Sequence, residues 1–296
     1  MSGVSKTGVT IIPPISARRR RTDRTMRGLL LTATLIALVP LVLVIYYLLY
    51  KGLSSWSSTF FTSDPNGSFF GNPGGVRSAI LGTLEIVALA TLISVPIGIG
   101  VALYLTEYGK QSWFANVVRY FIDVMTGVPS IVFGLFIYIV LVLAKVGGSG
   151  FAGWKGAVAL ALLMLPIVTR SSEVVLLLVP ASLREAALAL GAPRWRVVTR
   201  IVLPTARTGL VTGSLLAVAR GMGETAPLLF TTAGAFAVTA NLNQQMNALP
   251  LQIYNDILSP KSAVVDRAWG AALTLVALVL ILNLIARAIS RRSSMA

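Results

Sequence analysis

Six long apolar runs separated by shorter polar segments dominate the sequence. They cover residues 28–50, 77–106, 120–144, 156–179, 206–235 and 268–289. Each run is long enough to cross a bilayer, because about 20 helical residues span the hydrocarbon core. The pattern therefore predicts an all-α integral membrane protein with six transmembrane helices.

The segments around these runs differ in composition and divide the chain. Residues 1–27 are basic and lack apolar periodicity, which predicts a disordered cytoplasmic tail before the first helix at 28–50. Residues 51–76 are rich in Ser, Gly, Asn and aromatic side chains, as expected of an external loop. Residues 77–290 hold the other five helices. Within them, 234–267 is too polar to cross, although 249–258 is expected to form a helix on the membrane surface.

Charge indicates membrane orientation rather than a nucleic-acid partner. The net charge is +15, yet 7 of the 25 Lys and Arg residues precede residue 28. With the N-terminus inside, the cytoplasmic segments hold 17 Lys and Arg and the external segments hold 6, in agreement with the positive-inside rule. We therefore expect both termini in the cytoplasm, and anionic lipid near the basic tail.

The chain contains no Cys and no His. Thiol chemistry is therefore excluded, and the commonest metal ligand and neutral-pH proton shuttle are missing. We expect no metal site, no cofactor and no catalytic residue.

The longest basic island between apolar runs is residues 180–205. Strong helix formers precede Gly191, which suits a left-handed helix end, and Pro193 suits the first turn of a new helix. The expected structure is a helix, a sharp turn and a second helix. A soluble DNA-binding helix-turn-helix has a similar connection, but apolar runs flank this island closely on both sides.

Two pairs of opposite charges lie inside apolar runs, Arg170 with Glu173 and Arg220 with Glu224. Their spacing places each pair on one helix face, and the cost of burying charge in lipid requires a partner or a wet cavity. Pairs at similar depth on adjacent helices favour an anion path, because guanidinium donors fit a phosphate-like oxyanion. Asp123, at the mouth of the third run, is a weaker candidate. The alternative is that the pairs only pin helices together.

The fifth run has two further features. Small residues recur every four positions, which allows another helix to approach closely: Gly209, Gly213, Ala217 and Gly221. Gly223 and Pro227 flank Glu224 and are expected to loosen the helix there, freeing backbone groups towards a ligand.

The spacing within 180–205 resembles the coupling-loop signature of permease subunits of ATP-binding-cassette (ABC) importers. Its Glu-Ala-Ala, Gly and Leu-Pro positions are filled by residues 185–187, 191 and 203–204. The resemblance implies the type-1 ABC importer permease fold, with a cytoplasmic coupling helix that docks into a groove on an ATPase. The coupling residues it implies are Glu185, Ala186, Ala187, Gly191 and Arg194.

Three further segments look like the A-type permease subunit of the phosphate-specific Pst importer. They are residues 220–230 with their Gly-Glu-Thr-Ala-Pro sequence, residues 127–136, and the Gly-Gly pair before 79–83. The resemblance covers about residues 74–290, and Thr225 in the first segment joins the charged pairs as a candidate path residue.

This resemblance implies a bacterial inner-membrane permease for inorganic phosphate, not an enzyme. Its implied partners are a C-type permease subunit completing a heterodimer, two copies of a cytoplasmic ATP-binding subunit, and an external phosphate-binding protein. The chain itself has no P-loop sequence with which to hydrolyse ATP. Sulfate or molybdate as the substrate, an ion-coupled secondary anion transporter, and a membrane scaffold are the alternatives.

Overall fold

The computed structural model describes residues 16–66, 72–109, 112–148 and 150–292. It is helical almost throughout, so the predicted all-α class is confirmed. The chain divides into two compact units, residues 1–49 and 50–296. The first described helix, α1 (Ala17–Ser55), begins eleven residues before the predicted start at residue 28.

Residues 17–27 are therefore helical, and the prediction that they belong to a disordered tail is wrong. Arg is a good helix former, and extending an existing helix adds one hydrogen bond for each residue fixed. The basic stretch is therefore helical because it continues the membrane helix that follows it. Residues 1–15 of the predicted tail lie outside the described residues.

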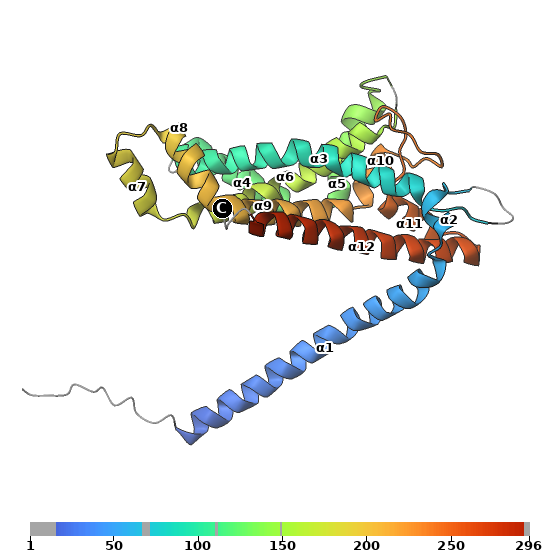
Figure 1. Cartoon of the computed structure of the whole chain (residues 1–296), viewed down its shortest axis with the longest axis horizontal. Coiled ribbons are helices and arrows are strands. Elements are labelled where there is room, and N and C mark those ends of the chain that lie inside the picture. The colour runs from blue at the N-terminus through green and yellow to red at the C-terminus, as the bar shows by residue number, and fades with distance from the viewer. Residues whose placement is uncertain (1–15, 67–71, 110–111, 149, 293–296) are drawn as a thin grey trace, which may run out of the picture. The chain divides into compact units, whose positions relative to one another are not determined.

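The described residues contain five helices long and apolar enough to cross a membrane, or six when one bent pair is counted as a span. Besides α1 they include α3 (Arg77–Leu103), α6 (Gly153–Leu177), α9 (Leu203–Met222) and α12 (Ser262–Arg292). Figure 1 shows the last four running lengthwise through the second unit. The helices α7 (Ala181–Ala189) and α8 (Arg194–Val197) lie at one end, here called the coupling-loop end, and α2 (Ser58–Thr62) lies at the other.

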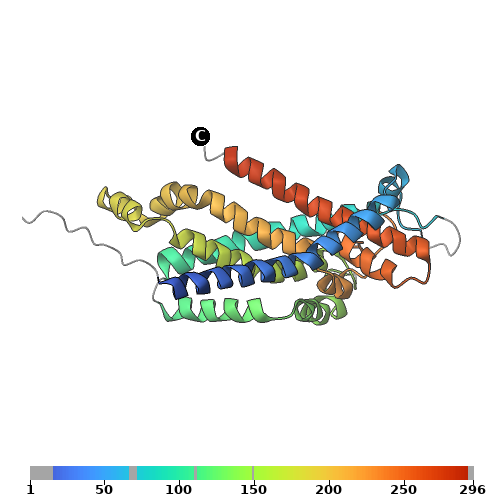
Figure 2. The same ribbon diagram turned by 90° about the horizontal axis from the view of Figure 1, so that it is seen from below.

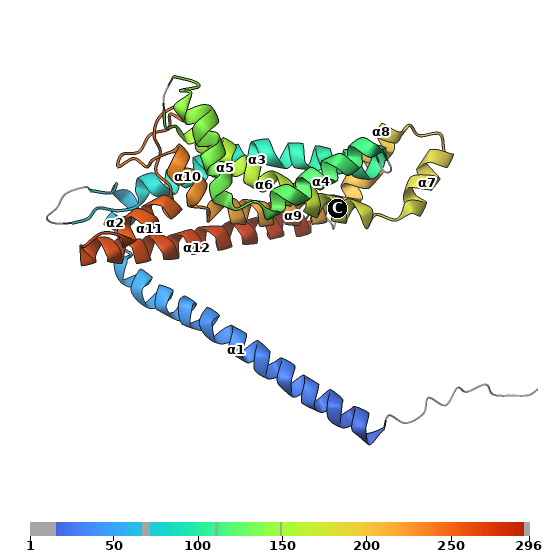
Figure 3. The ribbon, with the colours of Figure 1, turned by 180° about the vertical axis from the view of Figure 1, so that it is seen from behind.

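The third apolar run is broken rather than straight. It forms α4 (Trp113–Gly127) and then α5 (Ser130–Ile137), which the π-helical turn η2 (Tyr138–Leu143) extends, and the two parts meet at 103°. Pro129 lacks an N–H and disfavours a helical conformation at Val128, whose φ and ψ are −71° and 129°. Figure 3 shows α5 turned away from α4, and Figure 2 places α4 (green) and α12 (red) on opposite edges of the bundle.

The fifth run is also interrupted. A π-helical turn, η3 (Val198–Val202), leads into α9, which ends at Met222, and the short α10 (Ala226–Thr231) follows. The expected continuous helix to residue 235 is therefore wrong. The loosening expected around Glu224 is confirmed, because Gly223 and Pro227 disfavour helix continuation.

Helix α6 lies at the centre of the bundle, packed against α3 and against α9. A Cβ added at Gly213 would lie 2.5 Å from Ser171 Oγ, and one added at Gly221 would lie 2.8 Å from Met164 Sδ. The predicted small-residue stripe is thus the surface on which α6 approaches. Since lipid supplies little hydrophobic drive between helices, this close van der Waals contact stabilises the pair.

The helix expected on the surface at 249–258 is present as α11 (Leu249–Ile257), but one side of it is buried. Asp256 accepts two hydrogen bonds from Arg267 of α12, at 2.8 and 2.7 Å, and Leu249 N–H donates to Thr83 Oγ1 of α3 at 2.8 Å. Arg267 lies on the next helix and Thr83 is remote in sequence, so the amphipathic pattern alone could not identify the packing.

Candidate functional site

The polar island 180–205 forms the predicted helix, turn and helix. Helix α7 ends at Ala189, Gly191 adopts φ +78°, and Ala192 N–H donates to Ala187 O at 3.1 Å to close the turn. A Cβ on Gly191 would meet nothing within 4 Å. The requirement for Gly at this position is therefore conformational rather than steric, because φ values in this range strain most side chains.

Arg184 ties this loop to the ends of two membrane helices. Its Nε donates to Glu107 Oε1 at 2.9 Å, and its two terminal nitrogens donate to Val179 O at 2.6 Å and Leu176 O at 2.8 Å. The two charged side chains are only 14% and 10% exposed. The Arg184 guanidinium thus satisfies two backbone carbonyl groups at the C-terminus of α6, where the helix dipole favours a cation.

The predicted coupling residues divide between two faces of the loop. Ala187 is buried against Val179 and Val197, whereas Glu185, Ala186, Gly191 and Arg194 are exposed. Glu185 and Arg194 also line a cavity of about 510 Å³ beneath the loop, together with Arg184 and Glu107. One face of α7 is therefore fixed to the chain while the other is accessible to a partner.

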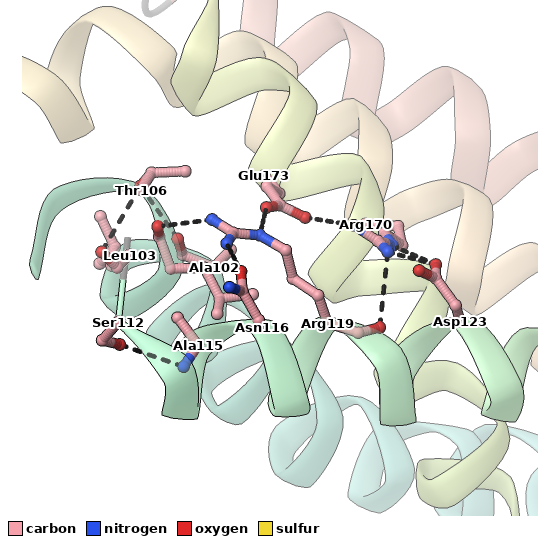
Figure 4. Close-up of polar contacts among 11 residues, drawn as sticks. Ala102, Leu103, Thr106, Ser112, Ala115, Asn116, Arg119, Asp123, Arg170 and Glu173 are labelled. Carbon is pink, nitrogen blue, oxygen red and sulfur yellow. Dashed lines mark hydrogen bonds and ion pairs between the residues drawn. The ribbon is translucent and has the colours of Figure 1, made fainter. Parts of the chain in front are cut away.

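A second group of charges joins α4 to α6 near the same end (Figure 4). Arg119 Nε donates to Glu173 Oε1 at 2.8 Å, and its terminal nitrogens reach Leu105 O at 2.9 Å and Asn116 Oδ1 at 3.3 Å. Arg170 donates to Glu173 Oε2 at 2.7 Å and to Asp123 Oδ1 at 2.8 Å. The two cations and two carboxylates sum to no net charge.

In this network every nitrogen of the Arg170 guanidinium is occupied, since the third lies 3.5 Å from Arg119 O. Glu173 is 6% exposed and accepts from both arginines. In this arrangement the group favours the helix-pinning alternative over direct anion binding. Arg119 directly precedes the predicted run 120–144 and is not among the candidate residues from the sequence, although its spacing of four from Asp123 matches one helix face.

The other pair is looser. Arg220, in the last turn of α9, has a side chain that is 61% exposed and an Nε 3.5 Å from Glu224 Oε1. Glu224 and Thr225 lie in the break between α9 and α10, where both are half-buried. Among the described residues the Arg220 guanidinium therefore keeps donors available to a ligand.

The two pairs do not lie at the same depth. Gly213 faces Ser171 and Gly221 faces Met164, so Arg220 lies about five residues of helix, roughly 8 Å, from the level of Arg170. The structure thus brings Arg170, Glu173 and Asp123 together and leaves Arg220 and Glu224 apart from them. The expectation of similar depth is wrong because the fifth helix ends sooner than its hydropathy suggests.

A family model for the inner-membrane component of binding-protein-dependent transport systems matches residues 94–294. Solved structures confirm the fold. A bacterial alginate ABC transporter chain superposes with a TM-score of 0.67 at 17% identity, covering 93% of this chain and 96% of that one. The inward-facing MetNI methionine ABC transporter gives 0.57 at 20% identity, covering 74% of this chain and 94% of that one.

Relatives in sequence are closer than these structures. The phosphate transport system permease protein PstA of Yersinia pestis is 41% identical over 276 residues, 92% of this chain and 91% of that protein. PstA of Mycobacterium leprae is 40% identical over 281 residues, 93% of this chain and 90% of that protein. With the fold and the coupling loop in place, the chain belongs to the binding-protein-dependent inner-membrane transport family and, within it, to the PstA permeases.

Proposed function

We propose that this chain is the permease subunit of an ATP-driven importer of inorganic phosphate and forms half of the translocation path. The observation that carries the proposal is identity of about 40% to PstA proteins over more than nine-tenths of the chain. The chain is a transport subunit and not an enzyme, so ATP hydrolysis belongs to another subunit.

In this proposal Arg220 binds the passing anion. Its exposed guanidinium lies beside Glu224, which neutralises it when no anion is present, and the 3.5 Å separation leaves the pair easy to part. A charge-assisted fork suits two phosphate oxygens at once. Thr225 adds a hydroxyl in the helix break. Competition between phosphate and Glu224 for the same donors would then allow release as well as binding.

The coupling residues transmit movement from the ATPase. Glu185, Ala186, Gly191 and Arg194 present the docking face, and Arg184 links that face to α6 and to Glu107 after α3. The network of Arg119, Glu173, Arg170 and Asp123 holds α4 on the same α6 (Figure 4). A displacement of α7 would therefore reach the helices on which the path is built.

The partners in this proposal are a C-type permease subunit, two copies of an ATP-binding subunit on the cytoplasmic side, and an external phosphate-binding protein. Both termini and residues 180–205 lie in the cytoplasm, as the distribution of Lys and Arg supports. The membrane is the bacterial inner membrane.

The test is purification of the complex from cells that express this chain with a tag, followed by ATPase assays in proteoliposomes. We expect co-purified permease and ATPase subunits, and ATP hydrolysis stimulated by phosphate-loaded binding protein. Stimulation by sulfate or molybdate instead would transfer the proposal to that oxyanion. Recovery of the chain without an ATPase, together with ionophore-sensitive anion uptake, would support a secondary transporter and overturn the proposal.

A further inference from the structure

A long groove lies between α3 and α9, away from the charged groups described above. It has a volume of about 550 Å³. The α3 residues that line it recur every four positions, and the α9 residues that line it lie on one side of that helix. The residues are Thr91, Val95, Ile99, Leu203, Pro204, Arg207, Leu210, Val211, Ser214, Leu215 and Val218.

Most of this lining is aliphatic, and two of its polar groups have no partner. Arg207 is exposed and is the one charged residue among those that line the groove. Within the described part of the chain no hydrogen bond or ion pair involves its side chain. The buried hydroxyl of Ser214 likewise has no hydrogen-bond partner there.

The position of Arg207 suits the edge of a membrane leaflet. It lies near the coupling-loop end of α9, whereas Val218 lies eleven residues further into the span. Eleven residues of helix cover about 16 Å, close to the roughly 15 Å that one leaflet contributes to the hydrocarbon core. The groove is thus lined mainly by aliphatic side chains over about the depth of one leaflet, and its one basic side chain lies near the coupling-loop end.

We propose that this groove binds an anionic phospholipid, with the headgroup phosphate on Arg207 and an acyl chain along α3 and α9. An unpaired guanidinium beside an apolar channel matches a phosphate attached to a hydrocarbon chain. The predicted topology places Arg207 at the cytoplasmic leaflet, where anionic lipids attract basic side chains.

A transmembrane helix of a partner subunit fits these observations less well. Such a helix would cross the whole bilayer, whereas the α3 residues that line the groove extend from Ile99 only to Thr91, close to the middle of that helix. It would also need a carboxylate at the depth of Arg207 to compensate the cation. The inference is independent of which anion the complex transports.

The purified complex, stripped of lipid in detergent, is titrated with dioleoylphosphatidylglycerol or dioleoylphosphatidylcholine, and native mass spectrometry counts the retained molecules. We expect one phosphatidylglycerol to be retained in preference to phosphatidylcholine. Arg207→Gln should reduce that preference at least about fivefold, the factor for one basic side chain at an anionic surface. Arg287→Gln is the matched control, because Arg287 is also exposed near the coupling-loop end but lies outside the groove. It should leave the preference unchanged.

A second variant tests the apolar part. Val211→Trp should fill the channel and lower retention of both lipids while Arg207 remains in place. An equal preference for phosphatidylglycerol in wild-type protein and Arg207→Gln would overturn the proposal. So would displacement of the lipid by excess inorganic phosphate, which would make Arg207 a site for the free anion. A cross-link from Ile99→Cys to a helix of the partner permease would assign the groove to that helix instead.

Discussion

Replacing Arg184 with Met should loosen the coupling loop without changing its docking face. The substitution keeps an unbranched side chain of similar length but deletes the donors to Glu107 Oε1, Val179 O and Leu176 O, which lie at 2.9, 2.6 and 2.8 Å. It also leaves Glu107, only 10% exposed, without its cation. The loss should therefore appear as local opening of residues 181–202.

The magnitude follows from the burial of the pair. Removing one partner of a buried ion pair costs about 3 to 5 kcal/mol. We expect about 3 kcal/mol, the lower limit, because the 510 Å³ cavity beside the pair admits water. At tenfold for each 1.36 kcal/mol, the loop should open roughly 150-fold more often.

Hydrogen–deuterium exchange of residues 181–202 in the assembled complex measures this opening, and the number of phosphate ions moved per ATP hydrolysed measures its effect on transport. Arg184→Met should speed exchange and lower that ratio. Arg194→Met is the control for exchange, because Arg194 is exposed and lines the same cavity. The double variant Arg184→Met with Glu107→Met should recover part of the loss, since it removes the unpaired carboxylate. Unchanged exchange and an unchanged ratio in Arg184→Met would refute the reasoning.

Three further predictions concern other parts of the molecule. Gly191→Val should strain the turn at φ +78°, whereas Gly191→Asn should be tolerated; the coupling ratio of the two variants compares them, and equal ratios would contradict this account. Glu173→Gln should leave Arg170 with one carboxylate and cost about 1 to 3 kcal/mol, measured as a lower melting temperature of the complex; no shift would argue against the network as a brace. On a Cys-free background, an impermeant thiol reagent added to intact cells should label Asn243→Cys but not Thr199→Cys; the reverse pattern would invert the topology.

Hydropathy was sufficient to locate the membrane helices and insufficient to describe two of them. The third and fifth runs contain enough apolar residues to span, so composition alone favours continuous helices. Pro129 and the Gly223-to-Pro227 segment determine the backbone instead, and they produce a 103° bend and an early helix end. The pattern of Gly and Pro was visible in the sequence, but its effect on helix direction depends on tertiary packing.

The coupling loop was predictable because its structure is local. Gly191 and Pro193 specify the turn whatever lies around it. The anchor of that loop was not predictable, since Arg184 reaches Glu107, which is remote in sequence. Lys155 shows the same limit. It lies between the predicted runs 120–144 and 156–179, where the sequence indicates an external segment, yet it is fully buried and donates to Leu141 O and Gly150 O at 3.1 and 2.8 Å.

Charged pairs in membrane helices were correctly marked as unusual, but sequence spacing could not assign their roles. Arg170 and Arg220 looked alike, each with a Glu three or four residues on. The structure separates them, because Arg170 is saturated by Glu173 and Asp123 while Arg220 is 61% exposed. The difference arises from α4. Its Asp123 pairs with Arg170, whereas among the described residues α4 provides no acidic partner for Arg220.

Phosphate uptake by the reconstituted complex carrying Arg220→Gln tests the central claim most directly. With wild-type protein we expect ATP-dependent uptake of radiolabelled phosphate through the binding protein. Arg220→Gln should abolish that uptake while the subunits still co-purify. Arg220→Lys should support little uptake, because an ammonium keeps the charge but loses the paired donors of the guanidinium. Near wild-type uptake by Arg220→Gln would contradict the claim that this residue binds the passing anion.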